Sequence, residues 1–505
     1  MQPTRSRSGG STTMKRHRLF GPGAAALLLA ACSAPASTGA PGETTPGAKT
    51  PNIVFVLTDD LATNLVPYMP HVKELQRDGT SFSDYFVTDS LCCPSRSSIL
   101  TGKYPHSTGV FTNNGDDGGY GAYNRNGNER DCYGPALQKA GYRTGFMGKY
   151  LNGYLPADKH GTDKPYVPPG WDEWDVAGNG YPEFNFGLNE NGKVVKYGHD
   201  PEDYLTDVVS KKATSFIDSS AAAKKPFVLE LATFAPHGPS TPAPRDAEDF
   251  PGLKAPRTPA YDKPSEPAPK WQSGLGPLSA DEQRSIDGKF AKRARSVQAV
   301  DDMIGRVRDE LKAKGLADNT YIVFSSDNGF HMGEHRLRPG KQTPYDTDIR
   351  VPLVVAGPGV AAGKEISQPA ANVDLSPTFQ ELAGVKPGGA ADGASLAPLL
   401  HGEQVTDWRR AVLIEHHRPA SKKDDPDAAP DSSGNPPSYE AVRTPNALWV
   451  EYADGEREYY DTERDPDEQH NRASSLSKTQ QTVLHETLTD LQKCEGSEAC
   501  AKAGQ

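Results

Sequence analysis

Short apolar segments that end in polar side chains constrain the fold of this chain more than any other feature. The segment PNIVFVLTDD is rich in β-branched and aromatic residues and closes with Asp59 and Asp60. The segment YIVFSSDNG repeats this pattern and contains Asp327 and Asn328. A short apolar run of this kind is typical of a strand that is buried on both faces of a parallel sheet. The sequence therefore predicts an α/β fold with polar groups at the carboxyl edge of its sheet.

A helix is predicted directly before the second of these strands. Apolar residues there recur at intervals of three and four, as on one face of an amphipathic helix: Val297, Val300, Ile304, Val307 and Leu311. The segment RVPLVVAGPG predicts a third buried strand. Helices that alternate with buried strands indicate a mostly parallel central sheet.

The character of the chain changes near residue 405. The segment ALWVEYADGEREYYDT predicts two strands joined by a turn at ADG. We therefore expect a main domain at 51–404, and a smaller C-terminal α+β subdomain with an antiparallel sheet and a tail at 405–505. The proline-rich segment from about 238 to 282 is too long for a simple connection, and we expect it to form a surface loop over the site.

The N-terminus has the pattern of an export signal. A basic start is followed by an apolar run, and the segment LAAC resembles a bacterial lipobox, in which Cys32 becomes the lipidated first residue of the mature protein. We assign residues 1–32 to this signal and 33–50, rich in Pro, Gly, Ser and Thr, to a flexible linker. The chain is expected to be exported and anchored in the cell envelope through Cys32, or else to be secreted after ordinary cleavage.

Charge and hydropathy bear on the partners of this chain. The formal net charge of −11 argues against nucleic acid as a partner. No later segment approaches the roughly 20 apolar residues of a membrane span, so we expect contact with a membrane only through the lipid anchor. An anionic substrate would have to be attracted by a local basic pocket rather than by the whole surface.

The other cysteines suggest a small disulfide. Cys494 and Cys500 are close enough in sequence to form one in an oxidising compartment. Cys132 either pairs with Cys93 or remains free.

Cys92 and Cys93 stand side by side at the predicted start of a helix. Pro94 suits the first turn of a helix, and the following residues can continue it as far as Thr101. Free amide groups and the helix dipole favour negative charge at such a start. A cysteine there is either a low-pKa thiolate or a member of a buried or disulfide-bonded pair.

The polar pairs at the two strand ends suit a hard cation. Asp59 and Asp60, together with Asp327 and Asn328, offer the carboxylate and amide oxygens that Ca²⁺ and Mg²⁺ prefer. Taken alone, such a pair after a strand is more often a turn or a helix cap.

Several motifs together resemble the type I sulfatases. The segment CCPSR followed by LTG is similar to the signature of that family, in which the first cysteine, here Cys92, is converted to formylglycine by a dedicated formylglycine-generating enzyme. The segments GKYLNGY, PPGWDEW and GKQTPYDTDIRVPLVVAGP look like the branch with N-acetylglucosamine-6-sulfatases and heparan endosulfatases, over roughly residues 51–475. The resemblance implies an alkaline-phosphatase-like three-layer α/β sandwich, with a sulfatase catalytic domain at 51–404.

The resemblance also implies a metal centre. Its expected ligands are Asp59, Asp60, Asp327, Asn328 and the modified Cys92, and its expected ion is Ca²⁺, with Mg²⁺ as the alternative. Arg96 is expected to hold the formylglycine and the carboxylates in place.

Further residues are matched to sulfate binding and to the leaving group. These are Lys149, His237 and Lys341. Many sulfatases carry Lys-x-His at the first of these positions; that histidine is absent here, and Asn152 is expected to supply the polar contact. His106 is expected to be a further member of the substrate pocket. His416 and His417 are expected on or beside a structural strand.

The resemblance implies hydrolysis of a sulfate ester, on a sulfated amino sugar or a glycosaminoglycan-type substrate. One hydroxyl of the formylglycine gem-diol, activated by the cation and Asp327, attacks sulfur, and His237 or Lys341 protonates the leaving oxygen. The second hydroxyl then loses its proton and expels sulfate. Two alternatives are a phosphodiesterase or phosphonate hydrolase of the same superfamily, and a non-catalytic lipoprotein that binds sulfated glycans with an unmodified Cys92.

Overall fold

A ten-stranded sheet forms the centre of this computed structural model, which describes residues 50–387, 390–418 and 431–505. The strand order is β11-β2-β10-β9-β1-β8-β4-β5-β6-β7. The five central strands, from β9 to β5, run parallel to one another. The predicted signal peptide, Cys32 and all but the last residue of the linker lie outside the described residues, so they stay predictions.

The strands of this sheet come from distant parts of the sequence. They are β1 (Asn52–Thr58), β2 (Thr80–Phe82), β4 (Arg143–Lys149), β5 (Glu173–Ala177), β6 (Gly187–Glu190), β7 (Lys193–Lys196), β8 (Phe227–Ala232), β9 (Thr320–Ser326), β10 (Leu353–Ala356) and β11 (Lys364–Ile366). A separate pair is formed by β3 (Tyr85–Phe86) and β12 (Ala370–Ala371). The helices of the main domain are α1 (Pro70–Asp78), α2 (Cys92–Thr101), α3 (Pro105–Thr108), α4 (Gly119–Arg125), α5 (Tyr133–Lys139), α6 (Leu205–Ala223), α7 (Ala280–Ala313), α8 (Asp346–Ile349), α9 (Leu375–Leu382) and α10 (Ala397–Leu400).

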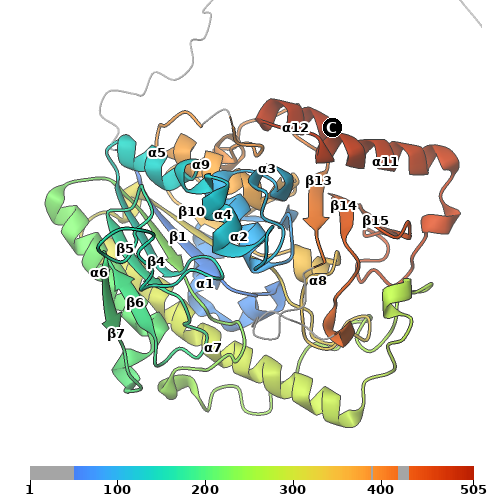
Figure 1. The fold of residues 1–505 in the computed structure, drawn as a ribbon, viewed down its shortest axis with the longest axis horizontal. Helices are drawn as coiled ribbons and strands as arrows, with labels where there is room; N and C mark the ends of the chain where they lie inside the picture. The colour runs from blue at the N-terminus through green and yellow to red at the C-terminus, as the bar shows by residue number, and fades with distance from the viewer. Residues whose placement is uncertain (1–49, 388–389, 419–430) are drawn as a thin grey trace, which may run out of the picture. The chain divides into compact units, whose positions relative to one another are not determined.

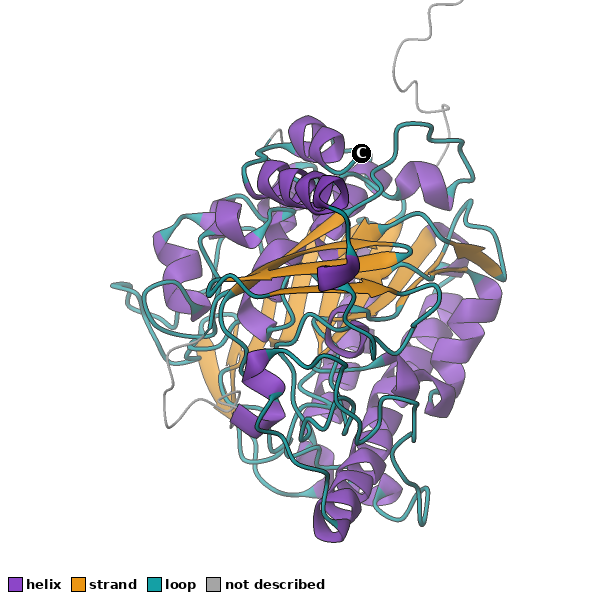
Figure 2. Cartoon of the chain, turned by 90° about the vertical axis from the view of Figure 1, so that its right-hand side faces the viewer, coloured by secondary structure: helices purple, strands orange, loops and turns teal. Residues whose placement is uncertain are grey.

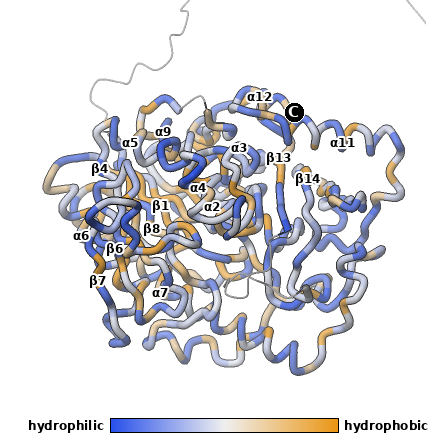
Figure 3. The backbone as a smooth tube through the Cα atoms, viewed as in Figure 1, coloured by the Kyte–Doolittle hydropathy of each residue, from blue (hydrophilic) through white to orange (hydrophobic). Residues whose placement is uncertain are grey.

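Helices cover both faces of the sheet, which gives the predicted three-layer sandwich (Figures 1 and 2). Strand β1 shows the physical reason. Ile53 and Phe55 belong to the apolar cluster that includes α2, α5 and α9, whereas Val54 and Val56 belong to the cluster that includes α6 and α7. Alternate side chains of a strand point to opposite faces, so a strand that is apolar throughout needs cover on both sides. In Figure 3 the backbone tube along the central strands β1 and β8 has the colour of hydrophobic residues.

The third predicted strand differs from the other two in direction. Strand β10 lies next to β9, as expected for a buried strand, but it runs antiparallel to β9 and to β2. A parallel neighbour needs a crossover of a dozen or more residues, usually through a helix, that returns the chain to the same edge. The segment between β9 and β10 (327–352) is long enough for such a crossover, but its helix α8 has four residues, and the chain re-enters the sheet at the end where β9 stops.

The C-terminal sheet is four-stranded and antiparallel, as predicted. Its strands are β13 (Val412–His416), β14 (Tyr439–Thr444), β15 (Ala447–Tyr452) and β16 (Arg457–Asp461). The ADG segment forms the turn between β15 and β16, and His416 ends β13. Helices α11 (Lys478–Gln492) and α12 (Ser497–Ala503) follow. Within the described ranges, no helix is both long enough and apolar enough to cross a bilayer.

Of the five cysteines in the described part of the chain, two form a disulfide and three lie outside any disulfide. Cys494 and Cys500 are bonded, which confirms the predicted terminal disulfide. The alternative pairing of Cys93 with Cys132 is wrong, because both are buried thiols that take part in no disulfide among the described residues. Burial raises the pKa of the Cys132 thiol to about 12, so this side chain stays neutral.

The segment 238–282 is a long connection, as its composition predicted. It contains two short 3₁₀ turns before α7 begins at Ala280. In the second turn, Gln272 Nε2 donates a hydrogen bond to the Tyr345 hydroxyl at 2.7 Å, and Trp271 Nε1 donates to the Tyr452 hydroxyl at 3.0 Å. The segment therefore packs on the loop that carries Lys341 and on the C-terminal sheet.

Gly148 allows β4 to approach β8 closely, and replacing it is expected to destabilise the protein. Its φ is +103°, and an added Cβ would lie 1.9 Å from the carbonyl oxygen of Ala232. We expect Gly148→Ala to lower the free energy of unfolding by roughly 2–5 kcal/mol, through backbone strain and a steric clash. Gly141→Ala is the control, because Gly141 has a φ of +93° with open space around it. Equal shifts of the urea midpoint in the two variants would contradict the role of the clash.

Candidate active site

The carboxyl ends of four central strands meet at one edge of the sheet. Leu57 of β1 pairs with Ala232 of β8 and Ser325 of β9, and Ala232 also pairs with Gly148 of β4. The polar residues that follow these pairs are Asp59, Asp60, Lys149, His237, Asp327 and Asn328. Because the strand ends are in register, the structure brings together residues that are far apart in the sequence.

Cys92 opens helix α2 against this edge and is fully buried. Its Sγ lies 3.3 Å from Oδ1 of Asp59, and Lys341 Nζ donates a hydrogen bond to Sγ at 2.9 Å. The sulfur of Cys93 instead accepts a hydrogen bond from the Asn152 amide at 3.0 Å. Of the two neighbouring cysteines, Cys92 is therefore the one that joins the polar group.

Three carboxylates and the Cys92 sulfur form a possible metal site. One ligand atom from each of Asp59, Asp60, Cys92 and Asp327 lies within 4.8 Å of all the others. Asn328 Nδ2 donates to Asp60 Oδ1 at 2.8 Å, while Asn328 Oδ1 is buried and accepts no hydrogen bond from any described residue. Clustered carboxylates with an unused amide oxygen are the donors of a hard divalent cation. The residues present therefore fit Ca²⁺ or Mg²⁺.

Two lysines neutralise part of this negative charge. Lys149 Nζ donates to Asp59 Oδ2 at 2.5 Å, and Lys341 Nζ donates to Asp60 Oδ1 at 2.7 Å. Burial alone would raise the pKa of Asp59, but Lys149, with further cations nearby, holds that pKa below its ordinary value. Burial likewise opposes the charge of Lys149, yet Asp59 raises the pKa of its ammonium. Both groups are therefore charged at neutral pH.

Arg96 joins helix α2 to two strand ends. Its Nε donates to Asp327 Oδ2 at 2.7 Å, and its Nη1 donates to the Lys149 carbonyl at 2.9 Å. Burial raises the pKa of Asp327 to about 6, against the lowering effect of Arg96. The guanidinium therefore lies next to the Asp327 carboxylate and 3.9 Å from that of Asp59, on the helix that carries Cys92.

His237 faces the same centre. Its Nε2 lies 3.7 Å from Asp60 Oδ2, and its Nδ1 lies 2.8 Å from the Gly238 carbonyl. A carbonyl oxygen can only accept, so the Nδ1 proton is fixed and Nε2 is the nitrogen that can exchange a proton at the centre. The ring centroid of Tyr181 lies 4.6 Å from that of His237 and 5.0 Å from Lys149 Nζ.

Arg293 was missed by the sequence analysis. It comes from α7 and donates to the carbonyls of Asp60 and, at 3.3 Å, Pro236. Burial lowers the pKa of this guanidinium to about 10, although Asp60 and Asp59 act in the opposite direction. Asp60 has a φ of +66°, a left-handed conformation that its contacts must hold in place. A helical arginine that binds backbone carbonyls of other segments leaves no motif by which the sequence could reveal it.

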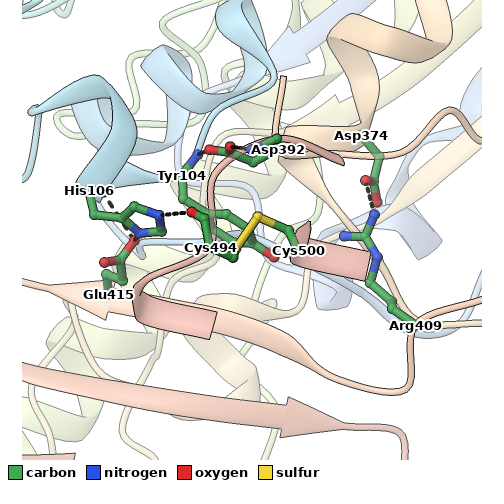
Figure 4. Close-up of a disulfide and its surroundings, with 9 residues drawn as sticks. Tyr104, His106, Asp374, Asp392, Arg409, Glu415, Cys494 and Cys500 are labelled. Carbon is green, nitrogen blue, oxygen red and sulfur yellow. Dashed lines mark hydrogen bonds and ion pairs between the residues drawn. A yellow bond between two sulfur atoms is a disulfide. The ribbon is translucent and has the colours of Figure 1, made fainter. Parts of the chain in front are cut away.

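His106 lies in a different cluster, beside the C-terminal disulfide (Figure 4). Its Nδ1 is 2.9 Å from Glu415 Oε2, and its Nε2 is 2.9 Å from the Cys494 carbonyl. Its ring stacks on Tyr104, with centroids 5.6 Å apart. These contacts join α3 to β13 and to the tail, so they give His106 a structural position. Its predicted contact with substrate is not supported by these partners.

Asn152 is placed beside the Cys92 centre through its backbone. Its amide donates to Cys93 Sγ, and its carbonyl accepts a hydrogen bond from the Tyr120 amide at 2.8 Å. The predicted role of its side chain in sulfate binding stays a prediction.

Comparisons with known proteins bear on the family and the fold of this chain. The sulfatase family model matches residues 51–385, and the model of the N-sulphoglucosamine sulphohydrolase C-terminal region matches 333–494. The chain is 34% identical to human N-acetylglucosamine-6-sulfatase over 478 residues, which are 89% of this chain and 86% of the human protein. It is 38% identical to the extracellular sulfatase SULF-1 homolog of Drosophila melanogaster over 72% of this chain, but it spans only 33% of that protein. A solved structure in complex with D-glucosamine-2-N,6-O-disulfate is 25% identical, with a TM-score of 0.72, and covers 88% of this chain and 98% of its own.

Divalent cations are expected to stabilise the protein through the three carboxylates. A ligand that binds only the folded state raises stability by about 2.7 kcal/mol at a hundredfold excess over its Kd. We expect CaCl₂ or MgCl₂ to raise the melting temperature relative to EDTA, and Asp60→Asn to remove most of this shift. Asp301→Asn is the control, since the Asp301 carboxylate is buried elsewhere and caps α1 through the His71 and Val72 amides. A shift that survives Asp60→Asn and disappears in Asp301→Asn would place the cation elsewhere.

His106 is expected to matter for stability rather than for turnover. Burial disfavours the charged ring, but the hydrogen bond and charge of Glu415 raise the pKa of His106 to about 9. The resulting stabilisation is fully present below the ordinary histidine pKa and is lost as the pH rises through 9. We expect His106→Ala to lower the free energy of unfolding by about 2 kcal/mol at pH 6 and by less at pH 10. A raised KM for a sulfated monosaccharide, with unchanged unfolding, would instead support a substrate contact.

Proposed function

Because the chain belongs to the sulfatase family, we propose that it hydrolyses a sulfate ester on a sulfated glucosamine or a glycosaminoglycan-type sugar. The substrate class is suggested by the name of the human relative and by the disulfated glucosamine bound in the solved relative. The matched region covers only 33% of the Drosophila relative, so the activity of that whole protein is not assigned to this chain.

The position of Cys92 carries this proposal. It is buried against Asp59, within the same group of ligand atoms as Asp60 and Asp327, and it touches the Lys341 ammonium. A binding protein would have no need for a buried thiol at the junction of three carboxylates. A nucleophile beside a cation site and a lysine is the arrangement that transfer of an anionic group requires.

Two groups supplied after synthesis fit this centre. Asp59, Asp60, Asp327 and Asn328 would hold a divalent cation, and residue 92 would carry the formylglycine. When bound, the cation supplies positive charge that polarises sulfate, and formylglycine supplies a hydroxyl nucleophile in place of the thiol.

The chain's own side chains then position the sulfate and move a proton. The ammonium groups of Lys149 and Lys341 donate to anionic oxygens at the centre and offset the charge of a bound sulfate. Arg96 fixes Asp327 and thereby the orientation of the strand end. His237 presents Nε2 to the centre and can donate a proton to the leaving oxygen.

The predicted export signal and the lipid anchor at Cys32 complete the proposal. A cell-envelope position would bring the centre to extracellular sulfated carbohydrate, and the terminal disulfide suits an oxidising compartment. Both remain predictions from the sequence.

The two neighbouring cysteines give a matched test. We expect Cys92→Ala to abolish hydrolysis of N-acetylglucosamine 6-sulfate, because the substitution removes the reacting group. The melting temperature should change by no more than a few degrees. We expect Cys93→Ala to keep most of the activity and to lose about 1 kcal/mol of stability, since the sulfur that accepts the hydrogen bond from the Asn152 amide is removed. Comparable activity in the two variants would contradict the assignment.

Two controls separate the alternatives. Mass spectrometry of the peptide that contains Cys92 reports conversion to formylglycine, in which oxygen replaces sulfur and two hydrogens are lost. A parallel assay on a nitrophenyl phosphodiester reports phosphohydrolase activity. A phosphodiester turned over faster than any sulfate ester would favour the phosphohydrolase alternative.

A further inference from the structure

Two hollows on the surface share Arg130. The first, of about 540 Å³, lies between the end of α2, helix α5 and the segment that follows α9. The second, of about 650 Å³, is lined by residues from within the segments 124–130 and 166–169. We call the two together the Arg130 trough; its charged lining residues are Lys103, Arg125, Glu129, Arg130, Asp131, Lys139 and Lys386. Each hollow has the size of an ordinary ligand pocket.

The two carboxylates of the trough already have partners. Asp131 Oδ2 lies 2.5 Å from Lys103 Nζ. Glu129 is buried, and its Oε2 accepts hydrogen bonds from Asn124 Nδ2 at 2.9 Å and from the Tyr166 hydroxyl at 2.8 Å. Asp131 is thus offset by Lys103, whereas the partners of Glu129 are neutral groups. Because five cations and two acids line the trough, an excess of positive charge remains.

Four cations of the trough are exposed and lack an acidic partner. They are Arg125, Arg130, Lys139 and Lys386, and none of them takes part in an ion pair within the described part of the chain. Arg125 donates a hydrogen bond to the carbonyl of Asp116, and the other three remain for a ligand. The whole chain has a net charge of −11, so the local charge of the trough is opposite in sign to the net charge of the chain. Local charge of one sign attracts an anionic ligand even on an acidic protein.

The floor of the first hollow is apolar between these cations. It includes Pro135, Ala136, Ala140, Val385 and Ala391. The second hollow adds the partly exposed ring of Tyr166. A sulfated sugar chain has the complementary chemistry, with apolar ring faces and anionic groups along its edges. A single-stranded nucleic acid would need several aromatic platforms, whereas the trough offers one ring.

The trough is separate from the Cys92 centre. Helix α2 begins at Cys92 and ends at Thr101, which lines the first hollow, so at 1.5 Å per residue the two lie about 14 Å apart along the helix. Helices α2, α5 and α9 pack on one another beside the sheet (Figure 1). No lining residue of the trough belongs to the centre.

We propose that the Arg130 trough is a second binding site for a sulfated polysaccharide chain, distinct from the centre that acts on the sulfate ester. The proposal rests on the proposed function only for the class of ligand. Binding at the trough keeps a long chain at the protein surface and raises the local concentration of its sulfate esters at the centre. A monosaccharide is too short to occupy the trough and the centre at the same time.

A charge-reversal experiment tests this site. The trough variant carries Arg130→Glu, Lys139→Glu and Lys386→Glu. The control variant carries Lys289→Glu, Lys292→Glu and Lys478→Glu, which changes the net charge equally at exposed lysines of α7 and α11. Binding to heparin is measured by titration with the full-length proteins, and KM is measured for N-acetylglucosamine 6-sulfate.

We expect the trough variant to bind heparin roughly tenfold or more weakly, since acidic groups replace three exposed cations that would contact the polyanion. The control variant should lose less than half of that effect, and both should keep the monosaccharide KM. Equal weakening in the two variants, or binding unchanged in the trough variant, would overturn the proposal. So would single-stranded DNA that binds the wild type as tightly as heparin.

The binding arm does not depend on turnover. A wild-type protein that hydrolyses no sulfate ester but loses heparin binding in the trough variant would contradict the proposed function and support the trough. If the wild type hydrolyses the monosaccharide but all variants bind heparin equally, the proposed function is supported and the trough proposal is contradicted.

Discussion

Neutralisation of buried carboxylates by cations from other segments is the interaction on which the centre depends. Asp59 and Asp327 are fully buried, and they are paired with Lys149 at the end of β4 and Arg96 on α2. Removing one partner of a buried ion pair typically costs about 3–5 kcal/mol, because the other charge is left without compensation. The strand ends and the start of α2 must therefore meet in one arrangement. That arrangement is also the one that places Cys92 next to Asp59.

The C-terminal sheet supports the centre through the loop that carries Lys341. Asp348 Oδ2 accepts hydrogen bonds from the amide of Thr343 at 3.0 Å and from its hydroxyl at 2.6 Å, which fixes the loop two residues from the lysine. The Tyr345 hydroxyl donates to the buried Glu458 of β16 at 3.0 Å. The predicted subdomain at 405–505 thus contributes to the centre, because its hairpin holds a loop from the main domain in place.

The sequence predicted those parts of the centre that follow from strand ends. Asp59, Asp60, Asp327 and Asn328 close apolar runs, and the carboxyl ends of parallel strands meet at one edge whatever loops lie between them. Arg293 could not be predicted, because its partners are backbone carbonyls, which any residue supplies. The direction of β10 was missed for a related reason: an apolar run predicts burial, whereas direction depends on the connection that precedes it.

An acidic protein can still bind an anionic substrate, because dissolved salt screens electrostatic interactions between distant charges. At physiological ionic strength the screening length is about 8 Å, which is shorter than the distance of about 14 Å along α2 between the centre and the trough. A sulfate ester at the centre therefore responds to Lys149, Lys341 and Arg96, and the net charge of −11 on the rest of the surface contributes little. A long polyanion differs from a monosaccharide in that it can contact both basic regions at once. Chain length, rather than charge density alone, is then the property that the two sites together can recognise.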